Sequence, residues 1–425
     1  MTKKPFERIS VIGLGYIGLP TAAMFASRKV EVVGVDVFKA VVDTINRGEV
    51  HIIEPDLDIL VRAVVTEGYL RATTVPEPAD AYLIAVPTPF KGDNHDPDLS
   101  YVVAAARSIA PVLRPGNLVI LESTSPLGAT EAMADILAEE RPDLTFPQHA
   151  GEASDIRVAH CPERVLPGKV MQELITNDRV IGGMTPACSA RAAALYKTFV
   201  TGACVIASGP RVAEMAKLTE NSFRDVNIAF ANELSLVSDR LGINVWELIA
   251  LANRHPRVNI LQPGPGVGGH CIAVDPWFIV SSAPEQARLI RTAREVNDSK
   301  TTWVIEKVLA AIGSHLTARP DKTASDVVLA LYGLAFKPDI DDLRESPALA
   351  IARLLASRHT GPIKIIEPNI DTLPRGLEKA TLIAPDAASA DIHVMLVDHT
   401  AFRGTALPRG IVVDTRGVWS KASHY

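Results

Sequence analysis

The sequence predicts an α/β protein in which a central helical segment joins two doubly wound domains. Three observations predict this fold. Strand-like and helical runs alternate near the N-terminus, a long stretch with helical spacing and no strand signal occupies the middle, and the alternation returns after about residue 320. The chain has 425 residues, which is too long for one ordinary core and indicates two or three domains.

The first domain is expected to span residues 1–200 and to contain a parallel sheet. Its first strand, ISVIGLG, leads through a glycine-rich turn into the alanine-rich helix PTAAMFASRK and then into the strand EVVGVD. Helical patterns separate two later strand-like runs, AYLIAVPTP and NLVILESTSP, as a doubly wound sheet requires. This order of elements is typical of a Rossmann-like domain.

A dinucleotide-binding motif lies between the first strand and the first helix. The segment Gly13-Leu14-Gly15-Tyr16-Ile17-Gly18 fits GxGxxG, and Asp36 ends the next strand. The glycines permit a tight turn and the close approach of a pyrophosphate, and Asp36 can accept hydrogen bonds from the adenosine ribose. A carboxylate there repels a 2′-phosphate, so NAD is expected rather than NADP. The alternative is a glycine turn that binds nothing, and the surrounding strand, helix and acid argue against it.

Two later strands end in segments that could contact a ligand. These segments are VPTP, which contains Thr88, and STSP, which contains Thr124. Ligands of doubly wound sheets bind at the carboxyl ends of the strands, where both segments are expected to lie. Either segment, taken alone, could equally be a turn that ends a strand.

The central segment is expected to span residues 201–318, to be mostly helical and to form a subunit interface. Its longest helical run begins at RVAEMAKLTENSFRD and places Lys217, Asn221 and Arg224 at i, i+4 and i+7. This spacing brings the three side chains onto one helix face, where they could line a site. A solvated helix face is the commoner explanation for such spacing.

The stretch PGPGVGGHCIAVDP, residues 263–276, surrounds Cys271 with glycine and proline and places Asp275 four residues further on. Neither a strand nor a helix favours this composition. Gly268 and Gly269 would leave backbone amides uncovered, and such amides can favour the thiolate of a nucleophilic cysteine. The alternative is a small buried hydrophobe, which is the usual role of a free cysteine, but a packing residue does not need a pliable loop.

The last domain is expected to span residues 319–425 and to contain a second, smaller α/β sheet. Strand-like runs are DVVLALYGLAF, KIIEP, DIHVMLVDH and IVVDTRGV, and the helical run SPALAIARLLASR follows the first of them.

Composition excludes several classes of protein. No apolar run reaches the length of a membrane span, and MTKKPFERIS does not read as a signal peptide, so a cytosolic protein is expected. The net charge is −6 and no basic block is present, which makes nucleic acid an unexpected partner. The four cysteines lack metal-site or disulfide spacing, so neither a zinc site nor a disulfide framework is indicated.

Several motifs together resemble one family, the nucleotide-sugar 6-dehydrogenases, which include the UDP-glucose and GDP-mannose enzymes. In chain order they are GLGYIGLP, VPTP, ESTSP, CPERVLPG, AEMAKLTENSFRDVNIAFANE, GGHC and GLAFKPDIDDLRESPA. The resemblance covers nearly the whole chain. Within the family, PERVLPG together with GPGVGGHCIAVDPWFIV resembles the branch that oxidises UDP-N-acetyl-D-mannosamine for bacterial surface polysaccharides such as the enterobacterial common antigen.

The resemblance implies a four-electron oxidation of the sugar's C6 alcohol with two NAD molecules at one site. Cys271 would capture the C6 aldehyde as a thiohemiacetal, whose oxidation leaves a thioester that water hydrolyses. Lys217 corresponds to the residue that exchanges a proton with the C6 oxygen, and Asn221 and Asp275 would order the sugar and water beside it. Thr124 and Glu163 are similar to residues that hold the hydrolytic water.

The resemblance also implies binding roles and a dimer unit. His255 and Arg257 lie in RHPRVN, which resembles a segment that reaches into a neighbouring subunit's site, so a homodimer or a dimer of dimers is expected. The C-terminal domain would bind the UDP moiety. The cofactor-binding residues implied are Gly13, Gly15, Tyr16, Ile17, Gly18, Asp36, Thr88, Thr124 and Arg344. The substrate-binding residues implied are Arg164, Val165, Lys217, Asn221, Arg224, His255, Arg257, Gly268, Phe336 and Lys337.

Two departures from the family pattern argue against UDP-glucose as the substrate. Val274 and Pro167 stand where the UDP-glucose enzymes carry a lysine and a second glutamate. UDP-N-acetylglucosamine and GDP-mannose remain alternative substrates. A non-catalytic NAD-binding regulator remains the alternative from another class.

Overall fold

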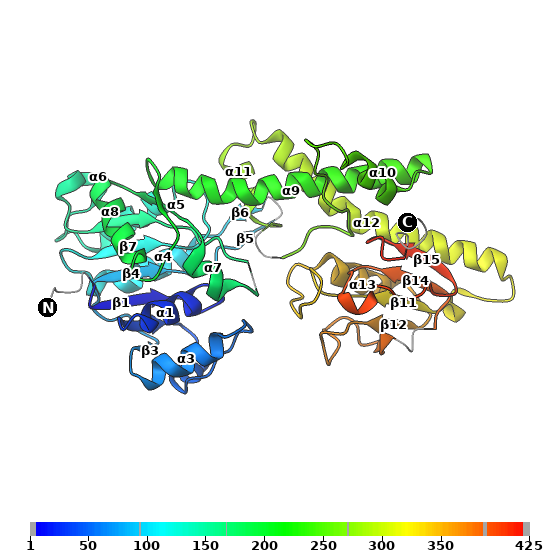
Figure 1. Cartoon of the computed structure of the whole chain (residues 1–425), viewed down its shortest axis with the longest axis horizontal. Coiled ribbons are helices and arrows are strands. Elements are labelled where there is room, and N and C mark those ends of the chain that lie inside the picture. The colour runs from blue at the N-terminus through cyan, green and yellow to red at the C-terminus, as the bar shows by residue number, and fades with distance from the viewer. Residues whose placement is uncertain (1–5, 93–94, 167, 270–271, 386–388, 420–425) are drawn as a thin grey trace. The chain divides into compact units, whose positions relative to one another are not determined.

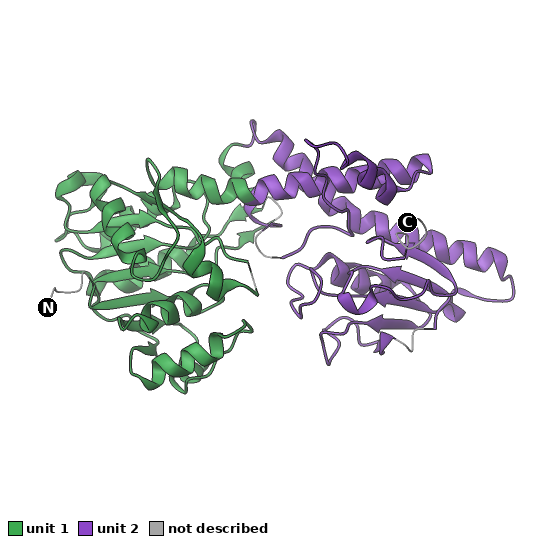
Figure 2. Cartoon of the chain, viewed as in Figure 1, with its two compact units in different colours: residues 1–220, 277–283 green, residues 221–276, 284–425 purple. Residues whose placement is uncertain are grey.

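The computed structural model describes residues 6–92, 95–166, 168–269, 272–385 and 389–419 (Figure 1). The chain forms two compact units. Unit 1 comprises residues 1–220 and 277–283, and unit 2 comprises residues 221–276 and 284–425 (Figure 2). Two helices, α9 (Pro210–Leu241) and α11 (Asp275–Ser282), contribute residues to both units.

Unit 1 is built on an eight-stranded sheet with the order β10-β9-β8-β7-β4-β1-β2-β3. The strands are β1 (Arg8–Ile12), β2 (Glu31–Val35), β3 (Leu70–Thr73), β4 (Ala81–Ile84), β7 (Leu118–Leu121), β8 (Arg157–His160), β9 (Arg179–Gly183) and β10 (Cys204–Ile206). Neighbours from β3 to β8 pair in parallel, whereas β9 runs antiparallel to β8. The chain order reverses between β1 and β4, which is where doubly wound sheets bind their ligands.

Helices cover both faces of this sheet because successive strand residues point to opposite sides. Along β7, Leu118 and Ile120 pack into one apolar cluster and Val119 and Leu121 into another. The first cluster includes residues of α1 (Gly18–Ser27), α2 (Lys39–Asn46), α3 (Leu57–Thr66), α7 (Val170–Thr176) and α8 (Pro186–Tyr196). The second includes residues of α4 (Ser100–Ile109) and α5 (Ala129–Glu140). A short helix, α6 (Pro147–Ala150), and a hairpin of β5 (Phe90–Lys91) and β6 (Asp96–Pro97) complete the unit.

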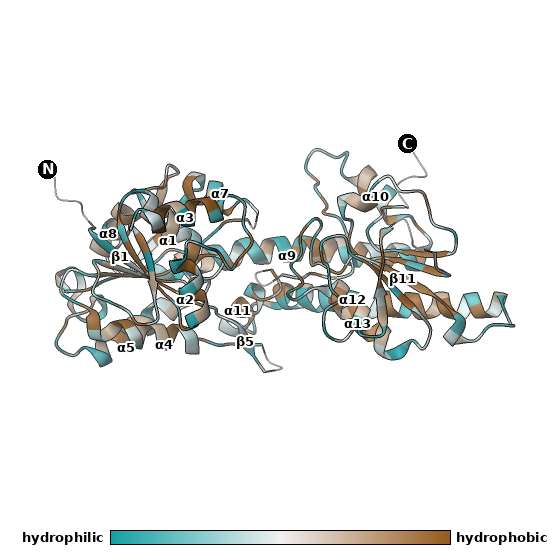
Figure 3. Ribbon diagram, turned by 90° about the horizontal axis from the view of Figure 1, so that it is seen from below, coloured by the Kyte–Doolittle hydropathy of each residue, from teal (hydrophilic) through white to brown (hydrophobic). Residues whose placement is uncertain are grey.

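Unit 2 contains a five-stranded parallel sheet with the order β13-β12-β11-β14-β15. Its strands are β11 (Leu329–Tyr332), β12 (Ile363–Ile366), β13 (Ala380–Leu382), β14 (Ile392–Met395) and β15 (Ile411–Asp414). One face packs against α12 (Arg288–Ala318) and α13 (Pro347–Arg358). Apolar residues are concentrated along the strands of each sheet, whereas the helices carry both apolar and polar faces (Figure 3).

The predicted fold class is confirmed, with two doubly wound sheets and long helices between them in sequence. A buried polar seam joins the long helices within unit 2, where Arg294 of α12 pairs with Asp225 of α9 at 2.7 Å. The remaining helix, α10 (Val245–Ala252), begins at a cap in which the Asn244 side chain accepts from the amide of Trp246.

The division of the chain into domains at 1–200, 201–318 and 319–425 stays a prediction. In the structure, β10 continues the first sheet to residue 206. None of the described helices is long and apolar enough to cross a membrane.

Candidate active site

The glycine turn after β1 has the geometry that its sequence predicts. Gly13 has φ +91°, and a Cβ there would lie 2.6 Å from the Ala85 carbonyl oxygen. A Cβ on Gly18 would lie 1.8 Å from the Gly13 carbonyl oxygen, so both positions need glycine. Gly15 differs, because among the described residues other than its two chain neighbours no atom lies within 4 Å of its Cβ position. The open side of the turn at Gly15, next to the N-terminus of α1, is suited to a pyrophosphate.

Asp36 joins the end of β2 to this turn. One carboxylate oxygen accepts from the Leu14 amide at 3.0 Å and the other accepts from the Phe38 amide at 3.0 Å. Each oxygen retains a lone pair that could accept from a ribose hydroxyl. The residues present therefore fit NAD, and Tyr16 lies in the same turn with 40% of its surface exposed.

The segments that follow β4 and β7 lie together because these strands are neighbours in the sheet. The Thr88 hydroxyl donates to the Thr124 carbonyl at 2.5 Å, and the Ser123 hydroxyl donates to the Val86 carbonyl at 2.7 Å. The structure thus brings Thr88 and Thr124 together at the carboxyl edge, as predicted from sequence.

Glu163 follows β8 at the same edge and is 7% exposed. One of its carboxylate oxygens accepts from the Arg164 amide at 2.7 Å, and the other forms an ion pair with Arg179. The Arg164 guanidinium pairs with Glu220 at 2.5 Å, and Val165 packs against the first apolar cluster of unit 1. The contact of Arg164 and Val165 with the substrate stays a prediction.

Sequence reasoning missed a set of buried polar side chains around Glu163, which we call the Glu122 cluster. It comprises Glu122, Cys161, Glu163, Arg179 and Tyr196. The Tyr196 hydroxyl donates to Glu122 at 2.6 Å, and the Arg179 guanidinium lies 5.1 Å from the centre of the Tyr196 ring. Burial raises the pKa of Glu122 to about 7 and the pKa of Cys161 to about 12. The available signal was an acid, Glu122, directly after the apolar run LVIL.

We expect Glu122→Gln to flatten the dependence of stability on pH. Because burial raises the pKa of Glu122 to about 7, the folded chain binds its proton more tightly than the unfolded chain does. Stability from this group is present below about pH 4.5 and is lost as pH rises through about 7. Wild type should therefore lose about 1–3 kcal/mol more than the variant across this window. Thermal melts at pH 5, 6, 7 and 8 measure the difference, and parallel curves would contradict it.

Helix α9 carries Lys217, Asn221 and Arg224 on successive turns, as predicted. Lys217 is 9% exposed and belongs to unit 1, whereas Asn221 and the exposed Arg224 belong to unit 2. The Asn221 amide donates to Asp275 at 2.5 Å, and Asp275 is 3% exposed. The structure thus brings together the two residues that the resemblance implies would order the sugar and water, and their roles stay predictions.

The glycines of the cysteine loop meet the segment that follows β11. A Cβ on Gly268 would lie 2.5 Å from the Glu345 carbonyl oxygen and 2.9 Å from Phe336 Cβ. Gly269 has φ +82°, and its Cβ would lie 3.0 Å from the Phe336 ring. Both glycines are therefore needed for packing against Phe336, a reason that the sequence did not supply. Cys271 itself lies outside the described residues.

A buried clamp holds the segment 333–346, which we call the Phe336 loop. Glu367, directly after β12, accepts from the amides of Leu334 at 2.7 Å and Ala335 at 3.2 Å. His399 lies 3.0 Å from the same carboxylate oxygen and accepts from the Asp339 amide at 2.9 Å. Burial opposes ionisation of Glu367, but the hydrogen bonds from His399 and the Leu334 amide outweigh it and lower its pKa.

The loop's cationic groups are Lys337 and Arg344. Arg344 donates to both carboxylate oxygens of Asp342, with the shortest contact at 2.6 Å. His255 and Arg257 are exposed beyond α10, where the Arg257 amide donates to His255 Nδ1 at 3.3 Å. The roles of all four side chains toward substrate, cofactor or a neighbouring subunit stay predictions.

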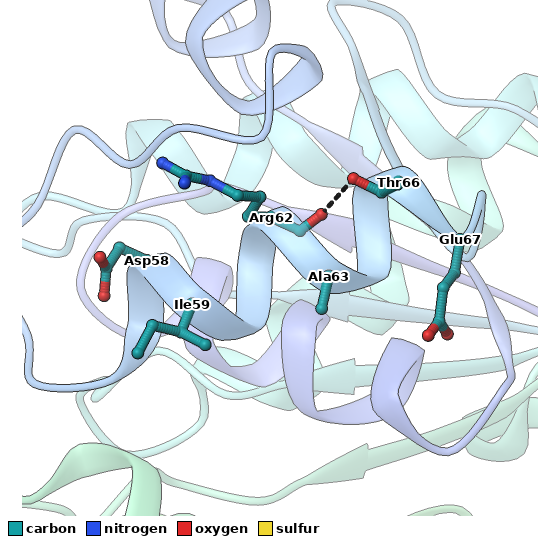
Figure 4. A pocket seen from close by; sticks show the side chains of 6 residues that line it. All are labelled: Asp58, Ile59, Arg62, Ala63, Thr66 and Glu67. Carbon is teal, nitrogen blue, oxygen red and sulfur yellow. Dashed lines mark hydrogen bonds between the residues drawn. The ribbon is translucent and has the colours of Figure 1, made fainter.

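A surface hollow on α3 contains none of the predicted site residues (Figure 4). One helix and the residue that follows it supply its lining: Asp58, Ile59, Arg62, Ala63, Thr66 and Glu67. Within the described ranges, no group of three His, Cys, Asp or Glu side chains could hold a metal ion.

Comparison with known proteins gives three family-model matches. The models describe the NAD binding domain (residues 7–200), the central domain (residues 211–299) and the UDP binding domain (residues 330–421) of the UDP-glucose/GDP-mannose dehydrogenase family. The chain is 67% identical over 420 residues to the UDP-N-acetyl-D-mannosamine dehydrogenase of Salmonella typhi, covering 97% of this chain and 99% of that protein.

Two further relatives are informative. The NDP-N-acetyl-D-galactosaminuronic acid dehydrogenase of Ralstonia nicotianae is 62% identical over 420 residues, which cover 98% of this chain and 97% of the relative. The solved structure of the UDP-D-ManNAc dehydrogenase from Pyrococcus horikoshii matches with a TM-score of 0.83 at 39% identity, covering 97% of this chain and 96% of that one.

Proposed function

This chain belongs to the UDP-glucose/GDP-mannose dehydrogenase family, and from that premise we propose that it oxidises the C6 alcohol of UDP-N-acetyl-D-mannosamine to the carboxylate. It is an NAD-dependent oxidoreductase. The observation that carries the substrate assignment is the 67% identity, over 97% of this chain, to a UDP-N-acetyl-D-mannosamine dehydrogenase.

The glycine turn and Asp36 would hold the cofactor. Gly15 leaves room for the pyrophosphate, Gly13 and Gly18 keep the turn tight, and Asp36 accepts from ribose hydroxyls. NAD supplies a hydride acceptor when it is bound. Two equivalents are consumed for each sugar, because one alcohol, two NAD and one water give one carboxylate, two NADH and three protons.

Cys271 and Lys217 are the proposed catalytic pair. Lys217 takes the proton of the C6 hydroxyl as the first hydride leaves. The Cys271 sulfur then bonds to the aldehyde carbon, and Lys217 returns a proton to the oxygen of the resulting thiohemiacetal. Loss of the second hydride would leave a thioester, with the hydroxyl proton of the thiohemiacetal passing to Lys217. Covalent capture keeps the aldehyde in the site between the two oxidations.

Hydrolysis of the thioester is assigned to Thr124 and Glu163, with Asn221 and Asp275 ordering the sugar and water. The hydrogen bond between Asn221 and Asp275 and the fixed carboxylate of Glu163 support these assignments. Arg164, Val165 and Arg224 are proposed sugar contacts. Gly268, Phe336 and Lys337 are proposed to contact the nucleotide sugar, with His255 and Arg257 supplied by a second subunit.

A nucleotide-sugar panel tests the substrate. The purified chain is incubated with NAD and, in turn, the UDP forms of N-acetylmannosamine, N-acetylglucosamine, N-acetylgalactosamine and glucose, and GDP-mannose. We expect the highest kcat/KM with UDP-N-acetyl-D-mannosamine, with two NADH formed for each sugar. A clear preference for another sugar would reject the substrate, and NADH formation from none of them would favour the non-catalytic regulator.

We propose that a homodimer forms through α9. Four apolar residues of this helix are spaced by seven, seven and four positions, which places them in one stripe. Their exposed fractions are large: Phe223 71%, Phe230 54%, Val237 47% and Leu241 64%. An exposed apolar stripe of this kind marks an interaction surface.

We expect Phe230→Glu to weaken this dimer at least about tenfold, because the charge would be desolvated in an apolar contact. Light scattering coupled to size exclusion measures the mass across a dilution series. Ile59→Glu is the matched control, since Ile59 is a similarly exposed apolar residue on α3. Equal masses for the two variants would reject α9 as the interface.

The proposed location is the cytosol, because a thiol nucleophile must stay reduced.

A further inference from the structure

The Glu122 cluster includes Glu163, which the proposed mechanism uses, and other members of the cluster restrict the position of the Glu163 carboxylate. Both carboxylate oxygens of Glu163 have partners, one in the Arg164 amide and one in the Arg179 guanidinium. Arg179 is 2% exposed, and its guanidinium lies 5.1 Å from the Tyr196 ring centre and 5.9 Å from the Phe199 ring centre. Two aromatic rings and an ion pair therefore restrict where the Glu163 carboxylate can lie.

The cluster contains two carboxyl groups and one guanidinium. Glu122 is 1% exposed, and its Oε1 accepts from the Tyr196 hydroxyl at 2.6 Å. Within the described part of the chain, Glu122 Oε2 and Arg179 Nη2 are buried without a hydrogen-bond partner. Two buried carboxylates beside one cation would leave an uncompensated charge, so one of them keeps a proton. Because Glu163 forms the direct ion pair with Arg179, we assign the proton to Glu122.

We propose that Arg179 is a positioning residue for thioester hydrolysis. Its guanidinium holds Glu163 in place as an ionised base, and Glu122, being protonated, does not compete with Glu163 for the ion pair with Arg179. This inference rests on the proposed function, in which Glu163 serves the hydrolytic water. In that step the water oxygen bonds to the thioester carbon and Glu163 accepts a water proton. The carbon–sulfur bond breaks, and the Cys271 sulfur leaves with the electron pair.

Arg179→Lys tests the role, because lysine keeps the positive charge but loses the planar fork that fixes a carboxylate. Misplacement by about 1 Å can slow a step about 100-fold. We therefore expect kcat to fall about 30- to 100-fold, with a rapid burst of two NADH for each site. Mass spectrometry of the intact protein should show an acyl adduct on Cys271 during turnover.

Arg191→Lys is the matched control. Arg191 lies in α8 with its guanidinium 3.9 Å from the centre of the Phe6 ring, outside the Glu122 cluster. We expect this variant to keep the wild-type kcat and to show no adduct. If Arg179→Lys slows the burst as much as kcat, or forms no adduct, the inference is overturned. A wild type that prefers another UDP-sugar would overturn the proposed substrate but not this inference, because hydrolysis is common to both.

A second variant keeps the inference testable if Arg179→Lys does not fold. Glu122 faces Arg179, Glu163, Tyr196 and Cys161 in the cluster. Its ionisation would draw Arg179 away from Glu163 and slow hydrolysis. Decay of the wild-type acyl-enzyme should therefore slow above about pH 7, whereas decay in Glu122→Gln should not. The same pH profile in both proteins would overturn the inference.

Discussion

Replacing Cys271 with alanine is expected to reduce formation of the sugar acid at least about 1,000-fold while NAD still binds. The physical reason is that the aldehyde formed by the first oxidation would have no sulfur to capture it, so the second oxidation would lose its thiohemiacetal substrate. Quantification of the acid by mass spectrometry measures the first effect, and calorimetric titration with NAD measures the second.

Cys204→Ala is the control for Cys271→Ala. Cys204 lies in β10 and is partly buried, and no mechanistic role is assigned to it. The control should retain wild-type turnover. Unchanged acid formation in Cys271→Ala would defeat the covalent mechanism and leave a cysteine-independent oxidation as the explanation.

Gly15→Ala is expected to weaken NAD binding at least tenfold while the melting temperature stays within about 2 °C of wild type. Apart from the two chain neighbours, no atom in the described part of the chain lies within 4 Å of the added Cβ, and the backbone at Gly15 has no positive φ. The methyl group would instead occupy the space that the pyrophosphate needs. A tenfold loss corresponds to about 1.4 kcal/mol of binding free energy.

Gly18→Ala is the contrasting variant in the same turn. Its Cβ would lie 1.8 Å from the Gly13 carbonyl oxygen, so the turn itself must move. We expect a lower melting temperature together with loss of NAD binding. If the melting temperatures of Gly15→Ala and Gly18→Ala fell equally, the distinction between ligand space and packing space in this turn would be wrong.

Local patterns were sufficient to predict the fold class and the cofactor turn. Alternating strand and helix periodicities predicted both sheets, and GxGxxG followed by Asp36 predicted a turn whose glycines prove sterically required at Gly13 and Gly18. These features could be predicted because each depends on residues close in sequence. The antiparallel direction of β9 could not be predicted, since strand direction depends on how the connection crosses the sheet.

The contacts between site residues that are far apart in the chain could not be predicted from the sequence. Arg179 and Glu163 are separated by 16 positions and Tyr196 and Glu122 by 74, and no local pattern links such pairs. The glycines before Cys271 were correctly noticed, but their packing against Phe336 depends on contacts between distant segments. Residue types were sufficient to propose a chemistry for the site, whereas the contacts between its side chains could be found only from the three-dimensional structure.

The clamp formed by Glu367 and His399 determines how the Phe336 loop can move. Glu367 directly follows β12, and His399 lies four residues after the end of β14. These strands are the two neighbours of the central strand β11, and both side chains bind the loop's backbone. The part of the loop from residue 334 to residue 339 is therefore held against its own sheet. A movement of the backbone at Lys337 toward a bound nucleotide must therefore either break these hydrogen bonds or carry the sheet with it.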